Sequence, residues 1–174
     1  MGDVFRCYVE KRPGFDGAAR ALRRELTEVL SVAGLAGVRI LNRYDVEGVS
    51  SETYAAARDA IRPNYDGVHF NFTVGAAVRC GSGKIYTGVN VYSLHGACAE
   101  QVALGAAITA GEREFTAIVA VRGADGEEVL PPCGNCRQIL SDYAPDCDVI
   151  LPAGGGVRKV PARELLPFAY AVED

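Results

Sequence analysis

Two short segments of this 174-residue chain hold side chains whose types and spacing could do chemistry. The first is Cys98-Ala99-Glu100 and the second is Pro132-Cys133-Gly134-Asn135-Cys136, so together they offer three thiols and one carboxylate. Three thiolates can hold a zinc ion while its fourth tetrahedral position stays open for water, whereas four would close the site and make it structural. We therefore expect Cys98, Cys133 and Cys136 to bind a catalytic zinc ion.

The residues that follow each segment predict helices whose N-termini point at this ion. The alanine-rich apolar run from Ala99 to Ile108 predicts a buried helix with Cys98 in its first turn. A second helix is predicted over residues 137–143, directly after Cys136. Two helix N-termini at one site would offset the negative charge of the thiolates and help to deprotonate them.

Glu100 is the candidate acid/base of the site. It lies two residues after Cys98, about 200° around the helix axis, so we do not expect it to bind the same ion. A carboxylate in a dry pocket can take a proton from an activated water and deliver it to a leaving amine. The alternative is that Glu100 only complements the positive end of its helix.

Other interpretations of the cysteines are open at this point. The six cysteines could form three disulfides. Cys133 and Cys136 could instead be a thioredoxin-like redox pair, because this spacing before a helix lowers the pKa of a thiol. That interpretation leaves Cys98 and Glu100 without a role. The remaining cysteines are interpreted as small hydrophobic residues, namely Cys7, Cys80 and Cys147.

Taken together, the two segments resemble the signature of the cytidine deaminase superfamily, Cys-Ala-Glu followed by Pro-Cys-Gly-x-Cys-Arg-Gln. The resemblance covers about residues 52–170. It includes Phe72-Thr73-Val74-Gly75-Ala76-Ala77, similar to the family's first strand, and Gly88-Val89-Asn90-Val91, similar to its second strand with a substrate-contacting Asn. The segment Leu165-Leu166-Pro167-Phe168-Ala169-Tyr170 is similar to the family's C-terminal tail.

This resemblance implies zinc-dependent hydrolytic deamination of a cytosine nucleoside, with cytidine or deoxycytidine giving uridine or deoxyuridine and ammonia. Glu100 would be the catalytic residue. It implies a homotetramer in which the tail of one subunit helps to close a neighbour's pocket, or a dimer if residues 1–50 cover the tetramer face. The implied substrate-binding residues are Phe72, Asn90, Tyr92, Ala99 and Tyr170.

Two positions depart from the family pattern. Many cytidine deaminases have Asn-x-Glu where this chain has Asn90-Val91-Tyr92, so the carboxylate that holds the ribose is missing. Asn-Val-Tyr is instead similar to blasticidin S deaminases, which gives a nucleoside antibiotic as the alternative substrate. Three-cysteine relatives also place Arg after the catalytic Glu to offset the thiolate charge, and this chain has Gln101. We expect Arg137 to carry that duty alone.

Residues 1–50 form a different unit from residues 51–174. They predict a small βαβ extension, with strands over 4–10 and 38–44 and a helix over 16–32 capped by Asp16. Their sequence resembles the extreme N-terminus of phosphoribosylformylglycinamidine synthase, in a stretch that holds no catalytic residues of that enzyme. We expect this extension to carry no chemistry.

The remaining residues predict an α/β fold with three layers, α/β/α, as the resemblance also implies. A helix over Ser51–Ile61 precedes a hairpin of strands 70–79 and 84–92. Further strands are predicted over 116–121 and 148–151, with a turn over 153–156 and a short helix over 162–166. Helices alternating with strands predict a central mixed sheet covered on both faces.

Composition agrees with a compact enzyme that acts on a small molecule. The net charge of −4 argues against a nucleic-acid binder, which normally shows a basic face. The chain starts without the apolar core of a signal peptide and has no run of membrane-spanning length, so we expect no membrane partner and a cytoplasmic location.

Overall fold

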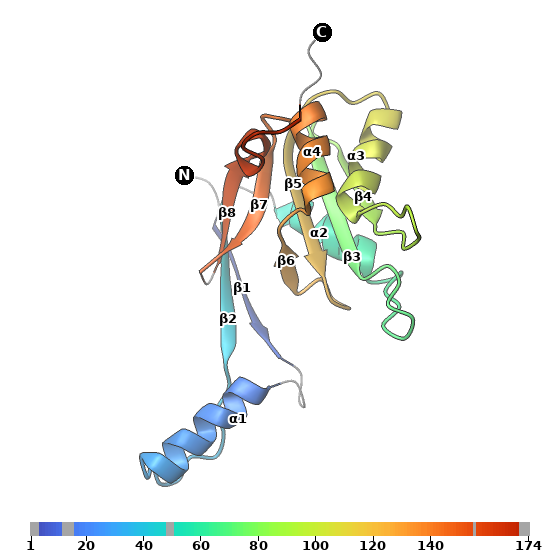
Figure 1. Ribbon diagram of the computed structural model, residues 1–174. Helices are drawn as coiled ribbons and strands as arrows, with labels where there is room; N and C mark the ends of the chain where they lie inside the picture. Colours follow the sequence, from blue (N-terminus) through green and yellow to red (C-terminus); the bar gives the residue numbers. More distant parts are fainter. Residues whose placement is uncertain (1–3, 12–15, 48–50, 155, 171–174) are drawn as a thin grey trace.

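The computed structural model describes residues 4–11, 16–47, 51–154 and 156–170 (Figure 1). Six strands form one mixed sheet in the order β4-β3-β5-β7-β8, with β6 paired to β5. The β5–β7 pair is parallel and the other pairs are antiparallel. The strands are β3 (Val74–Cys80), β4 (Ile85–Val89), β5 (Phe115–Arg122), β6 (Glu128–Leu130), β7 (Asp148–Ala153) and β8 (Gly156–Pro161).

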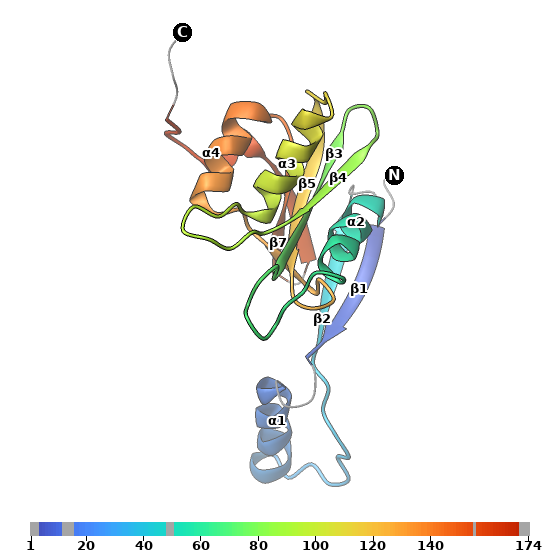
Figure 2. The same cartoon turned by 90° about the vertical axis from the view of Figure 1, so that its right-hand side faces the viewer.

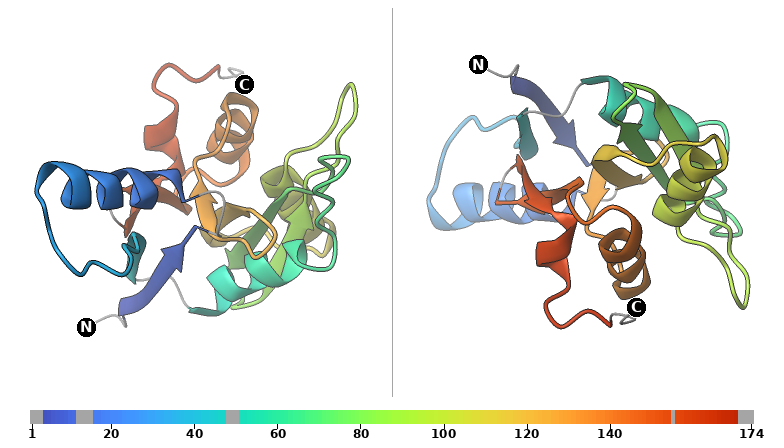
Figure 3. Two further views of the ribbon diagram at one scale, coloured as in Figure 1. Left: turned by 90° about the horizontal axis from the view of Figure 1, so that it is seen from below. Right: turned by 90° about the horizontal axis from the view of Figure 1, so that it is seen from above.

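Three helices cover the two faces of this sheet. Helix α2 (Ser51–Ile61) lies on one face, and α3 (Ala99–Thr109) and α4 (Gly134–Tyr143) lie on the other (Figure 3). Side chains of β5 alternate between the two cores, so that Ile118 packs toward α3 and Val119 toward α2. The predicted three-layer α/β/α architecture with a mixed sheet is confirmed.

Two glycines allow helices to approach the sheet closely. A Cβ at Gly75 would lie 2.5 Å from the carbonyl oxygen of Ala57 in α2. A Cβ at Gly88 in β4 would lie 2.6 Å from the backbone nitrogen of Ala103 and 2.8 Å from the carbonyl oxygen of Ala99. The absence of a side chain at Gly88 therefore sets how closely the N-terminal half of α3 packs on β4.

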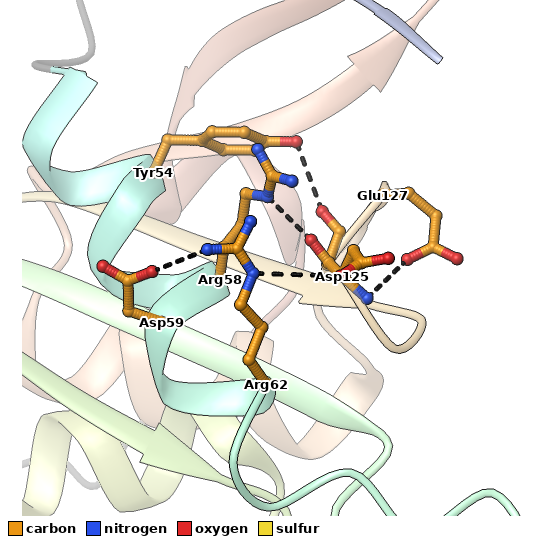
Figure 4. A network of polar contacts seen from close by, with 7 residues as sticks. Tyr54, Arg58, Asp59, Arg62, Asp125 and Glu127 are labelled. Atoms are coloured by element: carbon orange, nitrogen blue, oxygen red, sulfur yellow. Dashed lines mark hydrogen bonds and ion pairs between the residues drawn. The ribbon is translucent and has the colours of Figure 1, made fainter. Parts of the chain in front are cut away.

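A polar network ties α2 to the turn between β5 and β6 (Figure 4). The Arg58 Nε donates to the carbonyl oxygen of Asp125 at 2.7 Å, and the Tyr54 hydroxyl donates to the carbonyl oxygen of Gly126 at 3.4 Å. The Arg58 guanidinium also lies over the Tyr54 ring, 5.9 Å from its centroid. These contacts fix the turn from which the chain enters β6 and then Pro132-Cys133.

The N-terminal residues form a separate two-stranded sheet with a helical excursion. Strand β1 (Val4–Glu10) pairs antiparallel with β2 (Leu41–Glu47), and β2 lies against β8. Between them, α1 (Gly17–Arg24) continues into a π-helical turn, η1 (Glu25–Val29), and projects away from the main sheet (Figures 1 and 2). The predicted order of strand, helix and strand is present, but the second strand begins three residues later than expected.

The helix predicted over residues 16–32 is shorter and less regular than expected. The Thr27 hydroxyl donates to the carbonyl oxygens of Arg23 and Arg24 at 2.9 and 3.2 Å, which competes with regular α-helical bonding. Positive φ angles at Ser31 and Gly34 then end the helical path. The Asp16 side chain makes no N-cap hydrogen bond, although Asp16 is the N-cap residue.

Other boundaries also differ from the prediction. Residues 70–73 lie outside β3, because Phe70 and Phe72 have positive φ angles of 58° and 51°, which no strand accommodates. Strands β6 and β8 were not predicted, and the short helix before the tail is a 3₁₀ helix, η2 (Ala162–Leu165). Among the described residues, no helix is both long enough and apolar enough to cross a membrane.

Candidate functional site

The three candidate zinc ligands come together where α3 and α4 begin. Cys98 is the N-cap residue of α3, Cys133 is the N-cap residue of α4, and Cys136 lies in the first turn of α4. Their Sγ atoms all lie within 4.8 Å of one another, and the Cys98 and Cys133 sulfurs are 3.5 Å apart. Sulfurs bound tetrahedrally to one zinc ion at about 2.3 Å would be separated by about 3.8 Å. The arrangement of the thiols therefore fits a zinc ion.

The structure changes the predicted position of the cysteines within their helices. Cys98 precedes the first turn of α3, and α4 begins at Gly134, so that Cys136 lies inside that helix and not before it. Both N-cap cysteines have extended backbone, with ψ of 155° and 173°. Each sulfur thus faces the free backbone N–H groups of a helix N-terminus, which favour negative charge.

The thiols differ in how readily they ionise without a metal. Burial raises the pKa of Cys98 and of Cys136, and the Glu100 charge acts in the same direction. Burial also opposes ionisation of Cys133, but hydrogen bonds from the backbone N–H groups of Cys136 and Asn135 and from the other two thiols lower the pKa of Cys133. A bound cation would stabilise the thiolate forms of Cys98 and Cys136, which are the forms that bind a metal.

Glu100 lies beside the thiols but outside the ligand cluster. It is the second residue of α3 and only 8% exposed, and the Cys136 thiol lies close enough to lower the pKa of its carboxyl group in part. Glu100 borders a small cavity that is otherwise lined by apolar residues, including Ala120, Leu130 and Pro132. Burial raises the pKa of Glu100, as a carboxyl group needs if it is to carry a proton near neutrality.

Asn90 is fixed to the start of β3 by two hydrogen bonds. Its Oδ1 accepts from the backbone N–H of Val74 at 2.8 Å, and its own N–H donates to the carbonyl oxygen of Val74 at 3.1 Å. The loop after Asn90 closes on itself, because the Val91 N–H donates to the carbonyl oxygen of Ala97 at 2.9 Å. Asn90 and Cys98 therefore flank the base of one closed loop.

The other predicted substrate-binding residues have different surroundings. Phe72 precedes β3 near Asn90 and is 36% exposed, and Tyr92 is on the loop after Asn90 and is 81% exposed. Ala99, the first residue of α3, is fully buried in the core. The structure thus brings Phe72, Asn90 and Tyr92 to one end of the β3–β4 hairpin.

Tyr170 lies on the tail that follows η2, beside α4. The Gln138 Nε2 donates to the Tyr170 carbonyl oxygen at 2.9 Å, and Tyr170 is 76% exposed. Phe168 is fully exposed, with a positive φ of 64°. Within the described residues, no hydrogen bond or ion pair joins Tyr170 to Phe72, Asn90 or the cysteines.

Arg137, which we expected to offset the thiolate charge alone, makes two hydrogen bonds to backbone carbonyl oxygens. Its Nε donates to the carbonyl oxygen of Pro132 at 2.9 Å and one Nη donates to that of Leu165 at 3.3 Å. Arg137 thus ties the loop that carries Cys133 to the tail. The residue that sequence reasoning missed is Gln101, whose Oε1 accepts from the backbone N–H of Cys98 at 3.1 Å. The Cys-x-x-Gln spacing of a capping box was the available signal.

The five cysteines whose side chains the structure describes are all free thiols, and none forms a disulfide. Cys80 and Cys147 are buried in the core, as expected for small hydrophobic residues. The Cys7 side chain lies outside the part of the chain whose side chains are described. A disulfide framework is therefore wrong for the described cysteines.

Residues 50–150, more than half of the chain, match the family model of the cytidine and deoxycytidylate deaminase zinc-binding region. The chain is 41% identical over 106 residues to a blasticidin-S deaminase of Bacillus cereus, covering 56% of this chain and 76% of that protein. It is 34% identical over 139 residues to a cytidine deaminase of Sporosarcina psychrophila, covering 75% of this chain and 94% of that protein.

The fold agrees with these sequence relatives. The crystal structure of cytidine deaminase from Burkholderia pseudomallei superimposes with a TM-score of 0.58 at 36% identity, covering 70% of this chain and 99% of that one. The sequence signature, the thiol cluster with its buried carboxyl group and these matches agree. The chain therefore belongs to the cytidine and deoxycytidylate deaminase family and is a hydrolytic deaminase.

Proposed function

We propose that this protein hydrolyses the exocyclic amine at C4 of a cytosine nucleoside, with zinc held by Cys98, Cys133 and Cys136 and protons carried by Glu100. The observation that supports this most directly is the cluster of three thiols within 4.8 Å beside a buried carboxyl group. When bound, zinc supplies the Lewis acidity that lets water act as a nucleophile near neutral pH.

Glu100 performs the proton transfers of this reaction. Its carboxylate takes a proton from the attacking water and passes it to the ring nitrogen next to C4, and a second transfer protonates the leaving amine. Water and the cytosine nucleoside are thus converted to the uracil nucleoside and ammonia. Burial suits Glu100 to both steps, because a raised pKa brings the carboxyl group closer to neutrality, where it can accept and release a proton.

Two substrate classes fit the sugar-binding end of the site. Asn90 has its Oδ1 engaged by Val74, so its Nδ2 is the group oriented to donate to a sugar oxygen. The Asn90-Val91-Tyr92 triplet offers no carboxylate for ribose, and the 41% identity to a blasticidin-S deaminase favours an antibiotic nucleoside as the second candidate. Ordinary cytidine and deoxycytidine are supported by the likeness to cytidine deaminases.

An ultraviolet assay with cytidine, deoxycytidine and blasticidin S separates these candidates, with ammonia release measured in parallel. Loss of the cytosine absorbance together with one ammonia per turnover is expected for at least one of the three. The Cys133→Ala variant should lose zinc and activity together, because it removes one of three ligands. A protein without stoichiometric zinc whose Cys133 and Cys136 cycle as a disulfide would instead support the thiol redox function.

We also propose that residues 51–174 are the deaminase and that residues 1–50 are an appendage to it. The matched region begins at residue 50, and β1 and β2 form a sheet of their own. The deaminase is proposed to be a homotetramer, because the rings of Phe168 and Tyr170 are too exposed for an unpartnered tail. Mass measurement in solution, with and without residues 1–50, distinguishes a tetramer from the dimer that a covered tetramer face would give.

A further inference from the structure

The segment between Asp125 and Pro132 is held at both ends by arginine side chains. Arg58 of α2 donates from Nε to the carbonyl oxygen of Asp125 at 2.7 Å, and Arg137 of α4 donates from Nε to the carbonyl oxygen of Pro132 at 2.9 Å. These two helices lie on opposite faces of the main sheet (Figure 3). The segment therefore connects α2, which carries no predicted site residue, with the helix whose first turn forms part of the thiol cluster.

The contacts around Arg58 hold the Asp125 end of this segment closely (Figure 4). The Tyr54 hydroxyl donates to the carbonyl oxygen of Gly126 at 3.4 Å, and the Arg58 guanidinium lies over the Tyr54 ring. Gly126 has a positive φ of 61°, and a Cβ at this position would lie 2.8 Å from the Arg58 Cγ. The turn thus rests directly on the Arg58 side chain, with no space for another side chain between them.

Strand β6 connects this turn to the site through both cores. It pairs with the C-terminal end of β5. Val129 is buried in the core beneath α2 together with Tyr54, whereas Leu130 packs against the core beneath α3 and α4. Leu130 and Pro132 also line the small cavity that Glu100 borders. A displacement of the turn that moves β6 therefore moves one wall of this cavity.

The chain from β6 to the first thiol of α4 is stiff. Strand β6 ends at Leu130, and Pro131 and Pro132 then lead directly to Cys133, the N-cap residue of α4. A proline ring fixes its own φ angle and restricts the preceding residue to extended backbone. Two successive prolines can absorb little of a shift by bond rotation, so a shift of β6 is passed on to Cys133.

We propose that Arg58 is a positioning residue of the deaminase site, which acts from the opposite face of the sheet through the turn, β6 and the two prolines. It sets where Cys133 and the cavity wall formed by Leu130 and Pro132 lie relative to Glu100. This inference rests on the proposed function, in which Cys133 and Glu100 take part in the reaction. The proposed sugar-binding end of the site lies at the β3–β4 hairpin and is not on this path, so Arg58 affects the chemical step more than substrate binding.

Replacing Arg58 by Met tests this link, with Arg62→Met as the matched control on the same helix. Met keeps an unbranched stem beside Tyr54 but cannot donate to the Asp125 carbonyl oxygen. Arg62 reaches the Asp125 carboxylate and not its carbonyl group, with 3.9 Å between Nε and Oδ1, and it also pairs with Asp59 at 3.1 Å. Exposed pairs of this kind contribute little to stability. Both changes remove one positive charge, so they differ in the contact to the backbone of the turn.

Both variants are compared with the wild type well below their unfolding midpoints, so that folded protein is measured. Arg58→Met should lower kcat for the deaminated nucleoside by about tenfold and speed zinc release into an excess of a chelator by about threefold or more, because small displacements of reacting groups are costly in rate. Its KM should stay within about twofold of the wild-type value, since the sugar-binding end is not displaced. Arg62→Met should leave kcat, KM and zinc release within about twofold of wild type.

Wild-type kcat and zinc release in Arg58→Met would overturn the proposal even with a lower unfolding midpoint, because a merely structural role lowers the midpoint alone. A loss confined to KM, or an equal loss of kcat in Arg62→Met, would overturn it too. Arg58→Gln decides the matter if Arg58→Met does not fold, and wild-type kcat in that variant is again the contrary result. A wild-type protein that deaminates no cytosine nucleoside contradicts the proposed function instead, and zinc release then still tests the position of Cys133.

Discussion

Gly88→Ala should damage the active site without touching any of its functional groups. The new Cβ would lie 2.6 Å from the backbone nitrogen of Ala103, 2.7 Å from the Val102 Cβ and 2.8 Å from the carbonyl oxygen of Ala99. Two of these three atoms belong to the backbone of α3, so no side-chain rotation can relieve the overlap. The helix that begins at Cys98 and carries Glu100 must move away from β4.

The size of this movement sets the expected effect. Ordinary contacts between nonbonded heavy atoms are about 3.5–4.0 Å, so α3 must shift by roughly 1 Å at its N-terminal half. Displacement of catalytic groups by about 1 Å can cost on the order of 10²-fold in rate. Overpacking of this kind also destabilises a protein by about 1–3 kcal/mol, which corresponds to a lowering of the unfolding midpoint by several degrees in a chain of this length.

The measurements are kcat/KM for the nucleoside that the wild type deaminates, zinc content and the thermal unfolding midpoint. The matched control is Gly105→Ala on the same helix, where a Cβ meets nothing within 4 Å. That change should leave kcat/KM unaltered and stabilise the protein by about 0.5–1 kcal/mol, because glycine is a poor helix residue. Wild-type kcat/KM and stability in Gly88→Ala would refute the argument that close packing on β4 positions the site.

Three further changes test individual side chains. Glu100→Ala should keep zinc and fold but lose about 10²–10⁴-fold or more in kcat, as measured by ammonia release, because it removes the proton carrier; near wild-type turnover would rule out this role. Tyr92→Glu should raise kcat/KM for cytidine by roughly 10- to 150-fold, the equivalent of one charge-assisted hydrogen bond of about 1.5–3 kcal/mol, and no change would mean that another group binds the ribose. Tyr170→Ala should raise KM while leaving zinc bound, as expected for a ring that closes a neighbour's pocket, and an active wild-type monomer in solution would contradict the shared pocket.

The cluster of three thiols could be predicted from sequence because its geometry is local. Cys133 and Cys136 are three residues apart at one helix N-terminus, and Cys98 begins a helix whose alanine-rich face must be buried. Two helix N-termini that both carry thiols can place those thiols around one metal ion. The spacing did not reveal that Cys98 and Cys133 are N-cap residues, because the backbone angle of a single residue decides that.

Features that depend on distant pairing could not be predicted in the same way. Strand β6 spans only three residues and is a strand only because it pairs with the C-terminal end of β5. The part of β5 that pairs with β7 lies before this end. The local pattern of β1 and β2 indicates strands but not that they run antiparallel. Phe70 and Phe72 likewise have positive φ angles, although such angles are usually found at Gly or Asn, so the sequence did not indicate them.

Arg137 and Gln101 show why the departures from a family pattern need a structure to interpret. From sequence, losing an arginine beside the catalytic Glu leaves Arg137 as the remaining cation next to the thiolates. In the structure Arg137 also links the loop that carries Cys133 to the tail through the carbonyl oxygens of Pro132 and Leu165. A cation at the position of Gln101 could offset charge, but it could not also accept the Cys98 N–H. The amide of Gln101 accepts that N–H, so at this position the chain has a cap for the helix that follows Cys98 in place of a cation.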